Sequence, residues 1–207
     1  MWRLSLISAP AALPLDRVGE VYPHCRLEPE AVNADQNHFL DTAIDSARRL
    51  CEAFTNRQLV TATWELVLDS FFEEGIFREG ALWLPRPPHQ SITSIKYLDG
   101  SGVEQTWAST DWGHDVPAAP ISETQQKARV WPAYGKTWPQ TRCQPAAVKV
   151  RFVNGYGATF DSVPPPLRKG MLLVVGELHE SRELQVTGTI VAPNILGAER
   201  LWWPFRT

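Results

Sequence analysis

The chain has 207 residues, of which 43% are hydrophobic, so it is long enough to bury a core as one embellished domain or as two small ones. Its 20 basic and 23 acidic residues give a formal net charge of −3, which provides no overall basic signal for nucleic-acid binding. Three widely spaced cysteines without metal-ligand spacing favour reduced thiols in a cytoplasmic product over a disulfide framework. No apolar run approaches the roughly 20 residues that a membrane-spanning helix needs.

Residues 1–34 are predicted to form an N-terminal arm that contains one short helix. The first 12 residues have the character of an extended segment. A helix is then favoured by three apolar residues that fall on one face, Leu15, Val18 and Tyr22. Gly19 and Pro23 work against this helix, because glycine and proline lower helix propensity.

The clearest amphipathic helix of the chain is predicted over residues 35–55. Its apolar stripe repeats at steps of three and four and consists of Phe39, Leu40, Ala43, Ile44, Ala47, Leu50, Cys51 and Phe54. The charged residues lie mainly on the other side, and they are Asp41, Asp45, Arg48, Arg49 and Glu52. Asn33 and Gln36 have the spacing of a capping box, and Asn56 suits a left-handed exit. Such a helix must bury its stripe, so we expect the following strand and a second helix near the C-terminus to cover it.

Residues 58–159 are predicted to form a β-rich insertion. Residues 59–69 alternate between apolar and polar side chains, which indicates a half-buried strand with Trp64 in the core. The strongest local signal is the Asp-Gly turn at residues 99–102, whose flanking runs predict a hairpin. Further short strands are expected at 81–84, 111–115, 128–131 and 148–153, with proline-rich segments between several of them.

A second helix is predicted over residues 166–182. Its apolar stripe consists of Leu167, Met171, Val174, Val175 and Leu178. A buried strand over 171–175 is the alternative, but the proline start and the polar tail favour the helix. Gly170 and Gly176 either weaken this helix or mark close packing against a neighbouring element.

The predicted fold class is therefore α+β. A small helical bundle comprises the long helix 35–55, the helix 166–182 and short terminal helices, and the β-rich insertion separates its parts. The helical core then spans residues 35–57 and 160–192, and residues 193–207 form a C-terminal docking segment.

The sequence contains no recognisable catalytic motif. It has no nucleophile elbow, phosphate-binding loop, dinucleotide fingerprint or zinc-protease signature. His179 and Glu180 come nearest to the last of these, but the second histidine is missing, and a solvated helix flank is the more frequent role. His114 and Asp115 are neighbours in a β-rich segment and would point to opposite faces. We therefore predict no enzymatic activity, no metal site and no cofactor.

The chain is unusually rich in tryptophan, with nine residues. Four of them could stack on sugars if they are exposed, although core or interface positions are the more usual role: Trp131, Trp138, Trp202 and Trp203. The last two belong to an aromatic C-terminal segment, and a terminus is usually frayed and polar unless it is held in place. These side chains are expected either to fold back on the domain or to dock on a partner, and the sequence favours neither.

A series of short motifs follows the chain in a characteristic order. They are ARRLCEAFTNR at 47–57, LVTATWEL at 59–66, LPRPP at 84–88, SITSIKYLD at 91–99, WP at 138–139, NGYG at 154–157, VPPPLR at 163–168 and HESRE at 179–183. Each motif alone is weak, but the ordered set is fairly specific. From about residue 36 to the C-terminus the chain resembles the head–tail connector (adaptor) family of tailed bacteriophages and related gene transfer agents.

This resemblance implies a structural virion protein and not an enzyme. Members of the family form a dodecameric ring beneath the portal and extend the DNA channel toward the tail. The implied partners are the portal protein, neighbouring copies of the chain, a lower neck or tail-terminator protein, and double-stranded DNA that passes through without specific binding; no membrane is involved. The implied location is the neck of a virion or phage-like particle, made in the bacterial host cytoplasm. A near-balanced charge suits such a channel, because a strongly basic wall would hold phosphates.

The resemblance also makes the C-terminal segment the expected portal contact, because this segment tends to dock on the portal in the family. By position and residue type, the candidate contacts are Leu201, Trp202, Trp203, Phe205 and Arg206. Two other functions stay open. A sugar- or peptide-binding module would use tryptophans of the β-rich part, and a small hydrolase would need a nucleophile–base pair that the sequence does not show.

Overall fold

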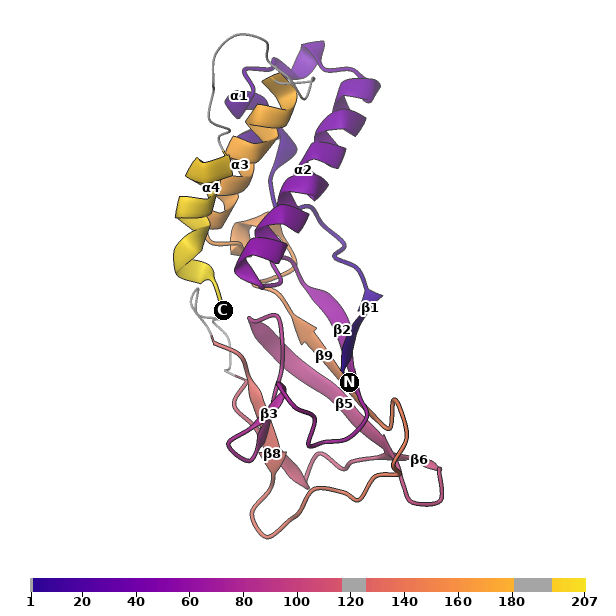
Figure 1. The fold of residues 1–207 in the computed structure, drawn as a ribbon. Coiled ribbons are helices and arrows are strands. Elements are labelled where there is room, and N and C mark those ends of the chain that lie inside the picture. The colour runs from indigo at the N-terminus through magenta and orange to yellow at the C-terminus, as the bar shows by residue number, and fades with distance from the viewer. Residues whose placement is uncertain (1, 117–125, 181–194) are drawn as a thin grey trace. The chain divides into compact units, whose positions relative to one another are not determined.

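The computed structural model describes residues 2–116, 126–180 and 195–207 (Figure 1). The fold is mixed α+β, as the sequence predicts, with helices and two antiparallel sheets. The chain forms two compact units: one consists of Met1–Pro10 and Thr61–Tyr156, and the other of Ala11–Val60 and Gly157–Thr207. The strands belong to the first unit, which we call the β unit, and the helices to the second, which we call the helical unit.

The larger sheet of the β unit has five strands in the order β1 (Arg3–Ser8), β2 (Ala62–Leu68), β9 (Val148–Asn154), β5 (His89–Leu98) and β6 (Glu104–Thr106). The strand β1 is an element that the sequence analysis does not predict. It pairs with β2 so that Leu4 lies opposite Leu66, and Leu4 packs against the core. The β5–β6 pair confirms the predicted hairpin, and the Asp99 carboxylate accepts hydrogen bonds from the backbone N–H groups of Ser101 and Val103 in its turn.

The smaller sheet has four short strands in the order β3 (Phe77–Arg78), β4 (Ala81–Trp83), β8 (Arg129–Pro132) and β7 (Trp112–His114). The strands expected near 81–84, 111–115 and 128–131 are thus confirmed, and β7 lies at an edge. One core cluster draws side chains from both sheets, which include Leu66, Ile95, Val150 and Phe152 from the larger sheet and Leu82 and Val130 from the smaller. The two sheets therefore bury apolar faces in a common core.

Aromatic side chains extend this core into the loops. The Phe71 ring centroid lies 5.5 Å from that of Trp107 and 5.0 Å from that of Trp138, and the two tryptophan centroids are 5.3 Å apart. Trp138, a candidate for sugar stacking, is thus packed against the core. Trp64, predicted for the core, is only partly buried, and the Arg86 guanidinium lies over its ring at 4.7 Å.

A charged triad on the larger sheet leads to a pH prediction. The Glu104 carboxylate accepts hydrogen bonds from Lys96 (2.8 Å) and Lys149 (3.0 Å), and these lower its pKa from 4.5 to about 2. Because the folded-state pKa lies below the unfolded one, the triad stabilises the fold above about pH 4.5, and this contribution is lost as the pH falls toward 2. The Glu104 side chain is 39% exposed, so solvent screening limits the effect to at most about 1 kcal/mol.

The substitution Glu104→Gln tests this expectation by urea unfolding at pH 7 and near pH 2. The variant should be slightly less stable than the wild type at pH 7, and the difference should vanish at the low pH, where the wild-type carboxylate is also neutral. Added salt should shrink the difference at pH 7, because it screens exposed charges. A difference that persisted unchanged at low pH would show that the charges do not carry it.

The helical unit contains η1 (Arg17–Val21), α1 (Tyr22–His24), η2 (Pro29–Ala31), α2 (Ala34–Thr55), η3 (Phe160–Ser162), α3 (Pro165–Glu180), α4 (Ile195–Trp202) and η4 (Trp203–Phe205). The short helix expected near 15–24 is present as η1, a π-helical turn, followed directly by α1. The element α3 confirms a helix rather than a strand in its region. The last two residues predicted for it, 181 and 182, lie outside the described residues.

The long helix α2 has the predicted ends. Asn33 and Gln36 form the capping box, each side chain accepting a hydrogen bond from the other residue's backbone N–H (2.9 and 3.1 Å), and Asn56 adopts the left-handed conformation at φ +55°. Its buried residues include Leu40, Ala43, Ile44, Ala47 and Cys51. These residues pack inside the helical unit, in which α3 lies between α2 and α4 (Figure 1). Cys51 is fully buried, which confirms it as a core residue, and this burial raises the pKa of its thiol.

Three residues of α2 differ from the prediction. Phe39 and Leu50, assigned to the apolar stripe, are 37% and 48% exposed because they lie at its margin. Glu52, assigned to the charged side, is only 5% exposed. Its burial is possible because the side chains of Arg48 and Gln58 donate hydrogen bonds to its carboxylate.

Candidate protein-interaction site

The C-terminal residues are held against the end of α2. The backbone N–H of Thr207 donates to the carbonyl of Thr55 (3.2 Å), and the Asn56 side chain donates to the carbonyl of Thr207 (3.4 Å). Arg57 Nε donates to the carbonyl of Phe205. The terminus is therefore folded back on its own unit, which is one of the two outcomes that the sequence left open.

Trp202 anchors this segment in the helical unit. Its side chain is 2% exposed, and its Nε1–H donates to the carbonyl of Leu167 at 3.2 Å. A Cβ atom at Gly170 would lie 2.2 Å from Trp202 Nε1, so α3 needs a glycine there for the indole to pack. The sequence analysis gave two explanations for Gly170, a weakened helix or close packing against a neighbour. The structure shows close packing.

Trp203, the next residue, has the opposite environment. It is 63% exposed, and its ring centroid lies 6.3 Å from that of Phe54. The Arg206 guanidinium carbon lies 5.5 Å from the Trp203 ring and 5.6 Å from the Phe54 ring. Cation–π contacts and ring packing therefore hold an exposed tryptophan and an arginine in place, and these residue types dominate binding energy at protein interfaces.

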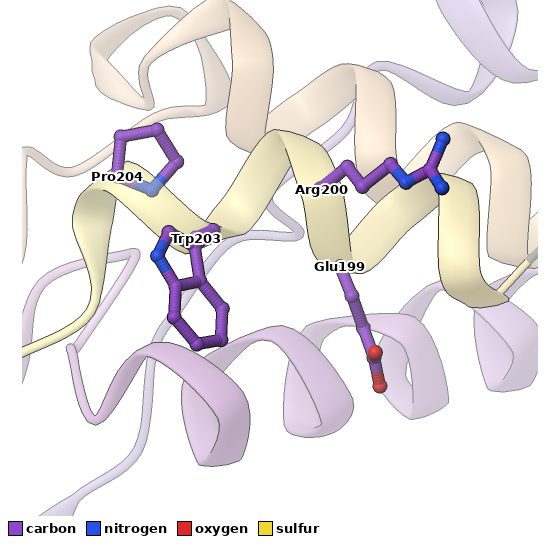
Figure 2. Close-up of a pocket in the computed structure, with 4 residues that line it drawn as sticks. All are labelled: Glu199, Arg200, Trp203 and Pro204. Atoms are coloured by element: carbon purple, nitrogen blue, oxygen red, sulfur yellow. The ribbon is translucent and has the colours of Figure 1, made fainter.

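An open pocket of about 470 Å³ lies beside Trp203 and is lined by Glu199, Arg200, Trp203 and Pro204 (Figure 2). Glu199 and Trp203 are four residues apart, and Figure 2 shows their side chains extending in the same direction, whereas Arg200 extends in another. Neither Glu199 nor Arg200 forms an ion pair within the described residues. The pocket can therefore take an apolar side chain of a protein partner against the indole and a charged group beside it. We call Glu199, Trp203, Pro204 and Arg206 the C-terminal site.

The five residues predicted as portal contacts have different environments. Trp203 and Arg206 are exposed, Leu201 is half-buried, and Trp202 and Phe205 are buried in the helical unit. Because Trp202 and Phe205 are buried, they could contribute to a portal contact only by holding Trp203 and Arg206 in place. The portal contact itself stays a prediction for all five residues.

Sequence reasoning missed two parts of the C-terminal site. Glu199 and Pro204 line the pocket, but neither was among the candidates. The step of four from Glu199 to Trp203 was the available signal, and it has meaning only once α4 is recognised as a helix. Phe54 was assigned to the buried stripe of its helix, although its ring also supports the exposed Trp203.

The tryptophans of the β unit do not match a sugar-stacking platform. The guanidinium carbons of Arg78 and Arg129 lie 4.6 Å and 5.2 Å from the centroid of the Trp83 ring. Of the two candidates in this unit, Trp138 packs in the aromatic cluster and Trp131 is 36% exposed. Sugar binding by stacking needs open indole faces, so this arrangement gives the binding-module reading little support.

His114 and His179, which the sequence analysis considered for a catalytic or metal-binding role, have structural partners. The His114 ring accepts a hydrogen bond from a backbone N–H, whereas Asp115 pairs with Arg129 at 2.7 Å. The His179 ring centroid lies 6.5 Å from that of Phe39. Among the described residues, no group of three or more His, Cys, Asp or Glu side chains could hold a metal ion. Nor does this part of the chain contain a helix of the length and apolar character needed to cross a membrane.

Chains of solved structures share this fold. A chain from the neck of an empty GTA particle computed with C6 symmetry aligns with a TM-score of 0.74 and 22% identity, covering 99% of this chain and 95% of that chain. A chain from the virion of a native gene transfer agent (GTA) particle aligns over the same shares, with a TM-score of 0.72 and 23% identity. A chain from the neck of a native GTA particle computed with C12 symmetry aligns with a TM-score of 0.63 and 20% identity, again covering 99% and 95% of the two chains.

These similarities establish a common fold across nearly the whole chain. No protein-family model matches the sequence, and no curated protein matches it.

Proposed function

We propose that this protein is a structural component of the neck of a virion or phage-like particle, where it acts as a head–tail connector. In this proposal it forms a ring beneath the portal and extends the DNA channel toward the tail. The observation that carries the proposal is the fold shared with GTA neck chains over 99% of this chain and 95% of those chains. Because these necks were computed with C6 and C12 symmetry, we take the assembly to be a closed ring, specifically a dodecamer.

The helical unit provides the contact with the portal in this proposal. We interpret α2, α3 and α4 as a small helical bundle that holds the C-terminal site in a fixed geometry. Trp203 and Arg206 then contact the portal directly. The buried Trp202 and Phe205 hold the backbone of this segment in place. The pocket beside Trp203 receives an apolar side chain of the portal.

The remaining partners follow from the same position in the particle. A lower neck or tail-terminator protein would bind the face of the ring that points away from the portal. Double-stranded DNA would pass through the channel, and a chain with a net charge of −3 would hold its phosphates only weakly. The chain would be made in the host cytoplasm and would function in the finished neck.

Mixing the chain with the portal protein of its own particle tests the proposal. Native mass spectrometry should detect a discrete complex with one copy of this chain per portal subunit. The substitution Trp203→Ala should weaken portal binding by at least about 30-fold, because an exposed, well-supported tryptophan has the properties of an interface hot spot.

The matched control is Trp131→Ala, which removes an exposed tryptophan of the β unit and should leave portal binding unchanged. Circular dichroism should show that both variants keep the wild-type helix content. An intact portal ring that bound no copies of the chain would contradict the connector role. Saturable binding of glycans by the isolated chain, without any portal affinity, would instead favour the binding-module alternative.

A further inference from the structure

The smaller sheet of the β unit presents basic side chains on the face that points away from the core. Arg78 lies opposite Ala81 in the β3–β4 pair, and Trp83 lies opposite Arg129 in the β4–β8 pair. Side chains alternate along a strand, and directly opposed residues share a face of the sheet. Arg78, Trp83 and Arg129 therefore lie on one side of the sheet, and the other side faces the core that the two sheets share.

A third basic residue belongs to the same face. Lys127 comes two residues before Arg129, and the backbone between them is paired with the neighbouring strand, because the Leu84 N–H donates to the carbonyl of Ala128 (2.8 Å). Alternation therefore puts Lys127 on the side of Arg129. Burial lowers the pKa of the Lys127 amine, and the positive charge of Arg78 lowers this pKa further.

We call Arg78, Trp83, Lys127 and Arg129 the cationic face. Its indole holds two of the basic side chains in place. The guanidinium carbons of Arg78 and Arg129 lie 4.6 Å and 5.2 Å from the Trp83 ring centroid, which is the range of a cation–π contact. The indole Nε1–H donates to the carbonyl of Arg78 (3.3 Å) and so fixes the ring itself. The two guanidinium groups are thus partly ordered before a ligand binds, which favours binding.

The described carboxylates neutralise only one of the three positive charges. Asp115 pairs with Arg129 Nε at 2.7 Å and also accepts a hydrogen bond from the Arg129 backbone N–H. Within the described residues, Arg78 and Lys127 form no ion pair, and neither does Glu79, which follows Arg78 in the chain. Arg78 is exposed and Lys127 is half-buried. The cationic face therefore offers two charges that an anion can neutralise.

The basic residues of the larger sheet have a different arrangement. Lys96 and Lys149 share the carboxylate of Glu104, at 2.8 and 3.0 Å. Arg151 pairs with Glu65 at 2.7 Å. These side chains already have acidic partners, so they attract a further anion less strongly than Arg78 and Lys127 do.

The compact arrangement of the cationic face suits a short acidic peptide segment. Its residues lie on adjacent strands, which are roughly 4.8 Å apart, so two or three neighbouring carboxylates match its extent. The planar guanidinium group also binds a carboxylate through two parallel hydrogen bonds. Duplex DNA carries one negative charge per about 1.7 Å of its axis, and a protein that holds it needs a longer row of unpaired cations.

We propose that the cationic face binds an acidic segment of a protein partner. The carboxylates of that segment accept hydrogen bonds from Arg78 and from the Lys127 amine. Arg129, which Asp115 and Trp83 hold in place, adds to the positive field. Charge complementarity of this kind selects the partner and speeds association. The inference goes beyond the proposed function, because it concerns the β unit and requires neither the portal nor the C-terminal site.

The first test uses a fluorescein-labelled oligo-glutamate peptide of about eight residues, titrated with the full chain at low ionic strength. Fluorescence anisotropy should show binding that weakens as salt is added. The double substitution Arg78→Gln with Lys127→Gln should weaken binding at least about tenfold. The matched control is Lys96→Gln with Lys149→Gln, which removes two positive charges that share Glu104 and should change the affinity by less than about twofold.

A second test needs no substitution and so does not depend on how a variant folds. Limited acetylation with acetic anhydride modifies unprotonated amines, and the lowered pKa of Lys127 favours its reaction. Saturating peptide should slow the acetylation of Lys127 several-fold, as measured by mass spectrometry. Lys136 is the internal control, because it is exposed and pairs with Asp111, and its acetylation should not change.

Three results would overturn the inference. The wild type could fail to bind the peptide at low salt, or it could bind no more tightly than a folded Arg78→Gln, Lys127→Gln variant. The peptide could bind and yet leave the acetylation of Lys127 unchanged. A DNA duplex of about 20 base pairs could bind more tightly than the peptide and lose this binding in the double variant, which would assign the face to nucleic acid. None of these measurements involves the portal, so their failure is distinct from a failure of the connector role.

Discussion

Replacing Trp202 with alanine is expected to lower the free energy of unfolding of the helical unit by about 3–5 kcal/mol. The indole is 2% exposed and fills the space that Gly170 leaves open on α3. Removing it creates a cavity and leaves the carbonyl of Leu167 without its indole N–H donor. Urea unfolding followed by far-ultraviolet circular dichroism measures this change, because the helices of the described chain all belong to this unit.

The neighbouring substitution Trp203→Ala is the natural control for that experiment. Trp203 is 63% exposed, so its loss should cost less than about 1 kcal/mol of stability. The two variants should thus have different effects. Trp202→Ala should destabilise the unit, whereas Trp203→Ala should mainly weaken the portal binding that we propose. Equal losses of stability in both would show that the two indoles do not have the different environments described above.

Local signals explain the parts of the fold that the sequence predicts well. The ends of α2 follow from Asn33, Gln36 and Asn56, whose capping and left-handed conformations involve only neighbouring residues. The β5–β6 hairpin follows in the same way from the turn around Asp99. Such features depend on interactions within a few residues, so periodicity and turn chemistry are enough to recognise them.

The sequence analysis missed features that depend on contacts with residues far away in the chain. The strand β1 exists because Leu4 and its neighbours align with a strand that begins at Ala62, and nothing in the first ten residues indicates that pairing. The contrast between Trp202 and Trp203 depends on the rotational position of α4 against α3, which the sequence of a short helix does not define. The aromatic segment was therefore recognised as a candidate site without any means of separating its buried members from its exposed ones.

The burial of the Glu52 side chain depends on its hydrogen-bond partners. The substitution Glu52→Ala is therefore expected to destabilise the helical unit by about 3–5 kcal/mol. Helical periodicity put this residue on the charged side of α2, yet it is 5% exposed. Its carboxylate accepts hydrogen bonds from Arg48 (2.9 Å), Gln58 (2.8 Å) and the backbone N–H of Leu59 (3.2 Å). Alanine would leave these donors without the carboxylate, including an arginine whose side chain is only 14% exposed.

Two further variants separate the charge from the shape at this position. Glu52→Gln keeps an acceptor oxygen of similar size and should lose less stability than Glu52→Ala, because only the charge-assisted part of the network is removed. Asp45→Ala, which removes an exposed ion-pair partner of the same arginine, should cost at most about 1 kcal/mol, since the Asp45 side chain is 39% exposed. Urea unfolding of the three variants at pH 7 should therefore rank the losses as Glu52→Ala, then Glu52→Gln, then Asp45→Ala. If Asp45→Ala proved as damaging as Glu52→Ala, the exposed ion pairs of α2 rather than the buried carboxylate would hold the end of this helix.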